Sequence, residues 1–269
     1  MNDLQNFFAG KKVLITGHTG FKGAWLAFLL HQWGARVAGI ALPPETTPNL
    51  FEALHLGQTI KDYCCDIRDF NAFEEIVIKE KPDILFHLAA QALVRRSYAA
   101  PLETFATNIL GTAHALEAIK NAKSVKAAVI VTTDKVYENQ ESDRAFREID
   151  PLGGYDPYSA SKAAADIVAS SYIRSYFNPE HYGTLHETRV AVARAGNVIG
   201  GGDWGEDRLV PDIARAVYEG DGVVSIRNPD SIRPWQHVFD CLDGYLRLSR
   251  ALYEGKEGLK TILEMSIRE

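Results

Sequence analysis

Residues 11–30, KKVLITGHTGFKGAWLAFLL, decide the fold of this 269-residue chain. An apolar run of strand length, Lys12–Thr16, leads into Gly17, Gly20 and Gly23, and a helical apolar pattern begins at Phe21. A backbone that turns tightly there and approaches a pyrophosphate cannot carry β-carbons, and the first turn of the helix offers free N–H groups to an anion. A tight turn without a ligand would use the same glycines, so these residues alone do not establish a nucleotide site.

Strand-length and helix-length patterns alternate along the rest of the chain. Further strands are predicted at Arg36–Ile40, Ile60–Cys64, Ile84–His87, Ala127–Thr132 and Arg189–Ala193. Helices are predicted at Phe21–Trp33, Phe70–Glu80, Leu102–Asn121, Pro157–Phe177, Leu209–Glu219 and Val238–Tyr253. The alternation predicts an α/β fold, a Rossmann-like doubly wound parallel sheet, over residues 1–195. Residues 196–269 then predict the start of a smaller substrate-binding region, with 234–254 packing back on the first domain.

Composition excludes several classes of protein. With 46% hydrophobic residues the chain can bury a substantial core, and its net charge of -6 argues against nucleic acid or an anionic membrane as a partner. The first residues do not resemble a secretory signal, and the three cysteines form neither a disulfide framework nor a metal-binding pattern. We expect a cytoplasmic protein with no metal site.

Polar residues follow the buried strand in AVIVTTDKVYEN, residues 128–139. Because ligands of such sheets lie beyond the carboxyl ends of the strands, Thr133, Asp134 and Lys135 are expected to face a substrate. In DPYSASK, residues 156–162, Tyr158 and Lys162 are four apart on one helix face, so the ammonium can favour the phenolate and make the phenol a base. A solvated helix face is the alternative for an isolated pair of this kind.

The motifs GHTGFKG, TTDKVYEN, LGGYDPYSASK, RAGNVIGGGDW and IRPWQHVFD together resemble the NAD-dependent sugar-nucleotide dehydratases of the extended short-chain dehydrogenase/reductase family, within them the group that acts on CDP-glucose. The resemblance runs from about Lys11 to Gly255. It implies the cofactor NAD, which the absence of Arg or Lys close after the second strand also favours over NADP. The cofactor-binding residues it implies are Gly17, Thr19, Gly20, Phe21, Gly23, Asp66, Ile67, Leu88, Ala89, Ala90, Tyr158 and Lys162.

The resemblance also implies a reaction. Tyr158 would remove the O4 proton of the sugar, Thr133 would share that proton, and Asp134 would protonate the C6 hydroxyl as it leaves, giving a precursor of dideoxy sugars. Related dTDP-glucose dehydratases have a glutamate where this chain has Lys135, which leaves the C5 base open: Lys135 either acts as that base or stabilises the enolate as a cation. Asn197, Arg208 and Arg233 are the implied substrate-binding residues.

Other interpretations remain open at this point. A 4-epimerase or a dehydratase for another sugar nucleotide would share Thr133, Tyr158 and Lys162, whereas a noncatalytic NAD-binding protein would have no reason to combine them with Asp134. The family usually continues well beyond the length of this chain; a natural short form, trimming or a frameshift would each account for that, and an incomplete substrate region could impair turnover. The resemblance implies a homodimer, or a dimer of dimers, formed through helices 102–121 and 157–177.

Overall fold

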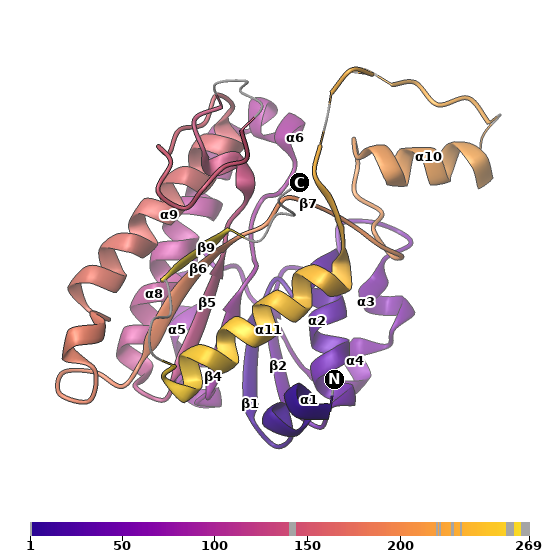
Figure 1. Ribbon diagram of the computed structural model, residues 1–269. Helices are drawn as coiled ribbons and strands as arrows, with labels where there is room; N and C mark the ends of the chain where they lie inside the picture. The colour runs from indigo at the N-terminus through magenta and orange to yellow at the C-terminus, as the bar shows by residue number, and fades with distance from the viewer. Residues whose placement is uncertain are drawn as a thin grey trace.

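A parallel sheet of seven strands lies at the centre of the protein (Figure 1). The computed structural model describes residues 2–139, 144–218, 220, 222–226, 229–231, 233–256 and 261–264. The strands run in the order β3-β2-β1-β4-β5-β6-β9. Their bounds are β1 Lys12–Thr16, β2 Arg36–Ala41, β3 Lys61–Cys64, β4 Ile84–His87, β5 Ala127–Val131, β6 Arg189–Arg194 and β9 Ile262–Glu264. Strand order reverses between β1 and β4, which opens the crevice where such sheets bind their ligands.

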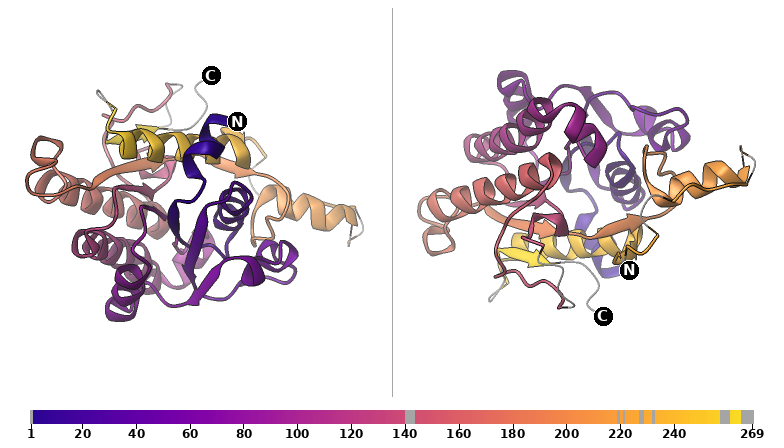
Figure 2. Two further views of the ribbon diagram at one scale, coloured as in Figure 1. Left: turned by 90° about the horizontal axis from the view of Figure 1, so that it is seen from below. Right: turned by 90° about the horizontal axis from the view of Figure 1, so that it is seen from above.

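Helices cover both faces of the sheet (Figure 2). On one face lie α1 (Asn2–Phe8), α2 (Phe21–Gln32) and α11 (Val238–Glu254). On the other lie α5 (Phe70–Glu80), α8 (Gly111–Ala122) and α9 (Pro157–Ser175). Shorter elements are α3 Leu50–Ala53, α4 Leu56–Thr59, α6 Val94–Ala99, α7 Pro101–Phe105, η1 Ala106–Leu110, η2 Asp134–Val136, η3 Pro179–His181, β7 Asn197–Ile199, α10 Leu209–Tyr218 and β8 Trp235–His237.

The two faces carry separate hydrophobic clusters, which explains the nearly continuous apolar strands. All five residues of β5 are buried, and alternate residues belong to opposite clusters: Val129 to the α2 and α11 side, Ala128 and Ile130 to the α5, α8 and α9 side. A strand covered on both faces has no polar side to alternate with. Burial on both faces therefore explains why these strands can be predicted from apolar runs in the sequence.

Side-chain caps begin two helices that flank the crevice. Asp69 accepts a hydrogen bond from the N–H of Ala72 at the start of α5. Asp156 accepts from the N–H of Ser159 at 2.9 Å, and Pro157 occupies the first position of α9. Both arrangements satisfy N–H groups that the helix itself leaves unpaired. The cap at Asp156 fixes where α9 begins and therefore where Tyr158 lies.

The structure differs from the sequence prediction at several elements. The helix expected over Leu102–Asn121 is divided into α7, the π-helical η1 and α8. Ile262–Glu264, expected to lie in the substrate-binding region, is a seventh strand that pairs with β6. The helix predicted at Leu209–Glu219 is confirmed as α10, which projects away from the sheet (Figure 1) with Val217 and Leu209 exposed. The division into two domains at residue 195 stays a prediction.

Candidate active site

The glycine turn after β1 lies in close contact with the chain that follows β4. Gly17 has φ +76°, and a β-carbon on it would lie 2.8 Å from the Ala89 nitrogen. A β-carbon on Gly23 would lie 2.1 Å from the Gly17 carbonyl oxygen. Glycine is therefore required at both positions, at the first for its backbone conformation and at both for space. The turn has the shape that a dinucleotide pyrophosphate needs, so these residues fit NAD.

The start of α2 is open to a ligand. Its N-cap, Gly20, is extended, and no side chain among the described residues caps it. The Thr19 hydroxyl donates to the Leu42 carbonyl oxygen at 2.9 Å, which ties the turn to the end of β2. A β-carbon on Gly200 would lie 3.3 Å from the Phe21 ring, so the glycine-rich loop after β6 packs against this helix start. Free N–H groups at a helix N-terminus favour a phosphate there.

Asp66 and Ile67 follow β3 at the far side of the crevice. Arg68 donates to both carboxylate oxygens of Asp66, and these bonds hold the pKa of that carboxyl below its usual value. Ile67 is buried against Gly111, where a β-carbon would lie 2.5 Å from its Cδ1 atom. The Ile67 carbonyl oxygen is also 2.9 Å from the His114 Nδ1 atom. The end of β3 is thus anchored to α8.

The three polar residues after β5 form one turn, as their sequence position suggests. The Thr133 hydroxyl donates to the Asp134 carboxylate at 3.0 Å, and the Asp134 N–H donates to the Ala195 carbonyl oxygen. Burial raises the pKa of Asp134, against the opposing influence of the Thr133 hydrogen bond and of the charges of Lys135 and Arg233. A carboxyl with a raised pKa keeps its proton to a higher pH than an ordinary one does, which suits it to act as an acid.

Tyr158 lies beside this turn. Burial raises the pKa of its phenol to about 12, and the charge of Asp134 adds to the rise; a hydrogen bond with Thr133 and the charge of Arg208 act in the opposite direction. The Lys135 ammonium lies 6.0 Å from the centre of the Tyr158 ring. The structure therefore brings Thr133, Asp134, Lys135 and Tyr158 together. Further positive charge is needed for the phenol to act as a base at neutral pH.

Lys162 is buried one helical turn beyond Tyr158, with its ammonium directed at the main chain. Its Nζ atom donates to the Val131 carbonyl oxygen at 2.8 Å. Burial and the charge of Lys22 together lower the pKa of Lys162 to about 7, with Asp166 acting in the opposite direction. The charge of the amine is therefore sensitive to any anion or cation bound in the crevice.

The residues predicted to bind substrate lie on three different segments. Asn197 begins β7 and pairs with Trp235 of β8. Arg208 donates to both oxygens of Asp203, at 2.8 and 2.9 Å, while its charge reaches Tyr158. Arg233 is exposed, and its charge acts on Asp134. Both guanidinium groups are therefore close to the catalytic candidates.

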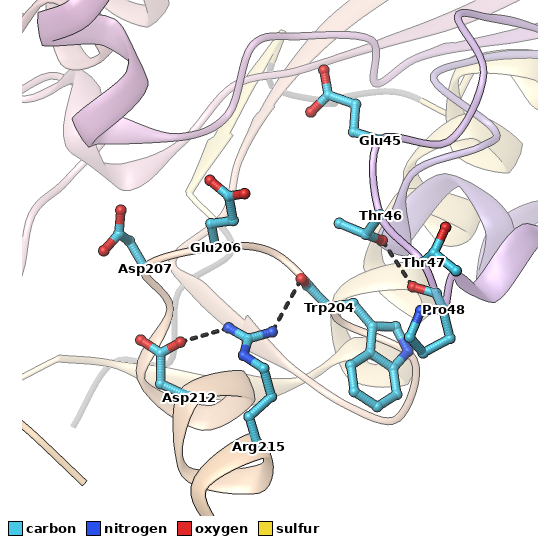
Figure 3. Close-up of a pocket in the computed structure, with 9 residues that line it drawn as sticks. All are labelled: Glu45, Thr46, Thr47, Pro48, Trp204, Glu206, Asp207, Asp212 and Arg215. Atoms are coloured by element: carbon cyan, nitrogen blue, oxygen red, sulfur yellow. Dashed lines mark hydrogen bonds and ion pairs between the residues drawn. The ribbon is translucent and has the colours of Figure 1, made fainter. Parts of the chain in front are cut away.

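A cavity of about 610 Å³ lies between the chain after β2 and the residue 204–215 segment (Figure 3). Four carboxylates line it: Glu45, Glu206, Asp207 and Asp212. Arg215 also lines it but is bonded to Asp212 at 2.5 Å and to the Trp204 carbonyl oxygen. Glu45, which is the acid nearest the end of β2, is 2.8 Å from Arg96 of α6. Arg95 likewise pairs with Asp207, so arginines neutralise three of the four carboxylates.

Sequence reasoning missed several residues that bear on the site. Lys22 acts on Lys162 and lies 3.4 Å from the Tyr245 hydroxyl. Arg194 is buried and donates two hydrogen bonds to Asp166 on α9, the helix that carries Tyr158 and Lys162. It also donates to the Tyr137 hydroxyl. A charged residue at the end of an apolar strand, as in RVAVAR, was the one available signal for Arg194. Nothing local in the sequence indicated its partner.

Within the described residues, no group of three or more His, Cys, Asp or Glu side chains is placed to hold a metal ion. None of the helices in the same ranges combines the length and hydropathy needed to cross a bilayer.

The chain is similar to known proteins both in sequence and in fold. The profile of the NAD dependent epimerase/dehydratase family matches residues 13–261. The chain is 50% identical to CDP-glucose 4,6-dehydratase of Salmonella typhimurium over 95% of its own length and 70% of that protein. It is 31% identical to dTDP-glucose 4,6-dehydratase of Haemophilus influenzae, over 88% and 71% of the two chains. The solved structure of DesIV, a dTDP-glucose 4,6-dehydratase of Streptomyces venezuelae with NAD and TYD bound, superimposes with a TM-score of 0.77 at 26% identity, covering 94% of this chain and 75% of that one.

Proposed function

Because the chain belongs to the NAD-dependent epimerase/dehydratase family, we propose that it converts CDP-glucose to CDP-4-keto-6-deoxyglucose and water. It would then be a hydro-lyase, as its sugar-nucleotide 4,6-dehydratase relatives are. The observation that carries the proposal is the Thr133–Asp134 hydrogen bond beside Tyr158. An acid with a raised pKa next to a phenol is what a reaction needs when it removes one proton and expels a hydroxyl.

The roles of the residues follow from their positions. Tyr158 takes the proton from O4 of the sugar, with Thr133 hydrogen-bonded to both the phenol and Asp134. NAD, held at the turn of Gly17 and Gly20, would supply the acceptor for the C4 hydride and the donor for C6, and its positive charge would favour the phenolate. The carbonyl at C4 acidifies the C5 proton, and Asp134 gives its own proton to the departing C6 hydroxyl. Lys162, held at the Val131 carbonyl, favours the phenolate whenever it carries its proton.

Lys135 is the candidate for work at C5. It lies on the same turn as Asp134 and on the same side of the turn as the Tyr158 ring, which supports a position next to the sugar. It acts either as the base that removes the C5 proton or as the cation that stabilises the enolate. Asn197, Arg208 and Arg233 would hold the nucleotide, and we assign the diphosphate to the two arginines because their charges act on Tyr158 and Asp134.

Further predictions concern the domains, the oligomeric state and the location of the enzyme. Residues 1–195 would hold NAD and 196–269 the sugar nucleotide. Leu102, Leu110 and Ile167, which are exposed on α7, η1 and α9, support a homodimer through these helices. We place the protein in the cytoplasm, where sugar nucleotides are made, and its product among the precursors of dideoxysugars such as those of O-antigen lipopolysaccharide.

The proposal is tested by incubating the purified protein and NAD with CDP-glucose, dTDP-glucose and UDP-glucose separately. Mass spectrometry should show loss of water from CDP-glucose, with NAD unchanged in amount after many turnovers. A 4-epimerase would give a product of unchanged mass, and a noncatalytic NAD-binding protein would bind the cofactor and leave all three sugars intact. Either result would refute the assignment.

A further inference from the structure

His87 is a buried histidine that the proposed reaction does not use. It is the last residue of β4, 1% exposed, and stands beside Thr16, the last residue of β1. Its Nδ1 atom is 2.9 Å from the Thr16 hydroxyl, and its Nε2 atom is 3.2 Å from the Thr112 hydroxyl on α8. Both ring nitrogens thus have partners on different elements.

The hydroxyls leave one protonation state for the ring. Thr112 donates its single proton to the Asn108 carbonyl oxygen at 2.7 Å, so it can only accept from His87 Nε2. The Thr16 hydroxyl accepts from the N–H groups of Leu88 and Ala89, each at 3.1 Å, and Leu88 shares its N–H with the Thr16 carbonyl oxygen at 3.2 Å. With two donors directed at its oxygen, the Thr16 hydroxyl donates its proton to His87 Nδ1. His87 is therefore the neutral imidazole protonated on Nε2.

The electrostatics of the ring agree with the direction of these bonds. Complete burial and, to a lesser extent, the charge of Lys162 lower the pKa of His87 to about 3. An imidazolium would have no lone pair for the Thr16 proton. Protonation of His87 would therefore break the chain of bonds at the Thr16 hydroxyl.

Thr16 in turn holds the backbone that meets the glycine turn. The Ala89 backbone nitrogen donates to the Thr16 hydroxyl. The same nitrogen lies so close to Gly17 that a β-carbon there would be 2.8 Å from it. The other end of the same loop is held by Asn108, whose amide exchanges two hydrogen bonds with the Gln91 backbone and donates a third to Ser161 on α9. Residues 88–91 are thus fastened at both ends by buried polar groups.

We propose that His87 is a positioning residue: as the neutral imidazole protonated on Nε2, it orients the Thr16 hydroxyl so that Leu88 and Ala89 are held against Gly17 in the shape that accepts the cofactor. The inference rests on the proposed NAD site but not on the sugar or on turnover. His87 itself touches neither cofactor nor substrate in this account. Its effect reaches NAD through Thr16 and the loop.

The first measurement is made on the unaltered protein. NMR of protein labelled at the histidine ring nitrogens, with the His87 signal assigned by its loss in His87→Gln, should show the neutral ring protonated on Nε2 from about pH 5 to about pH 9. A ring protonated on Nδ1, or one that titrates within that interval, would overturn the proposal. This result does not depend on any variant of Thr16 folding.

The second measurement is NAD affinity by calorimetric titration. Thr16→Val keeps the shape of the side chain but removes the hydroxyl, so the Kd for NAD should rise about tenfold, whereas Thr16→Ser should bind almost as the unaltered protein does. Thr184→Val, which removes an exposed hydroxyl bonded to His181, is the matched control and should change nothing. Equal affinity in Thr16→Val would contradict the positioning role, and it would leave the dehydratase proposal untouched.

Discussion

Asp134 and Lys135 are the residues to which the proposed function assigns the steps at C6 and C5, and both are half-buried. Asp134 has a raised pKa and is hydrogen-bonded to Thr133. Lys135 is half-buried and faces the Tyr158 ring. The burial that favours a proton on the carboxyl suits an acid, and an adjacent ammonium suits either removal of the C5 proton or stabilisation of the enolate.

Replacing Asp134 by Asn should separate the two halves of the reaction. Asparagine keeps the shape but cannot give a proton to the departing hydroxyl, so loss of water should slow by about a hundredfold to ten-thousandfold. Exchange of the C5 hydrogen with deuterated solvent should continue. In the unaltered enzyme, kcat for water loss should fall as pH rises through the raised pKa of Asp134, because the acid form is the active one. If the Asn variant loses water at the normal rate, Asp134 is not the acid.

Replacing Lys135 by Met decides between the two roles left open at C5. If Lys135 is the base, the exchange of C5 hydrogen with solvent should fall about a hundredfold or more, while oxidation at C4 persists. Exchange at the normal rate would remove the base role and leave the cationic one. Lys126→Met, at the opposite end of β5, is a suitable control and should leave both rates unchanged.

The helix interrupted at η1 shows what an element contributes to the site. Asn108 lies in the π-helical turn, is 1% exposed, and has every amide atom bonded. A π-helical turn re-aims side chains relative to a regular helix and is often found at functional sites. Here it directs one amide to the loop after β4 and to α9, which carries Tyr158 and Lys162.

Asn108→Ala should therefore be costly for the whole fold. It leaves the N–H and carbonyl groups of the Gln91 backbone without their partner, removes the bond to the Ser161 hydroxyl and opens a small cavity, so we expect the free energy of unfolding to fall by about 3 kcal/mol in urea titrations. Asn121→Ala on α8 removes an exposed bond to Glu74 and should cost less than about 0.5 kcal/mol. Similar losses in the two variants would show that the Asn108 bonds do not support the fold.

Local signals were sufficient to predict some elements and could not predict others. The predicted strands and glycine turn were confirmed. They could be predicted because burial on both faces and a tight turn each restrict the residue types at consecutive positions. The break at η1 was not predicted, because Leu102–Asn121 has an uninterrupted helical pattern and the cause lies in distant Gln91 and Ser161. The pairing of β9 with β6 and the bond from Lys162 to Val131 likewise depend on contacts that no short segment records.

At the scale of the whole molecule, His87 should make stability depend on pH. Its pKa is about 3 in the folded protein against 6.5 as the ordinary value, so between these values the unfolded chain binds a proton that the folded one does not. The free energy of unfolding should fall by about 1.4 kcal/mol for each pH unit below the ordinary value. His87→Gln should lack this part of the slope, measured as the difference between the two proteins in urea at several pH values. Parallel curves would mean that His87 is protonated in the native state.

The proposed reaction requires the whole molecule to bring a cofactor site together with an acid, a phenol and two arginines. The measurement that tests it most directly is the fate of deuterium placed on C4 of CDP-glucose during turnover with unlabelled NAD. We predict that the product has lost water and carries the deuterium on C6. Water loss with the label released to solvent or retained at C4 would contradict the account, and so would recovery of intact substrate from protein shown to bind NAD.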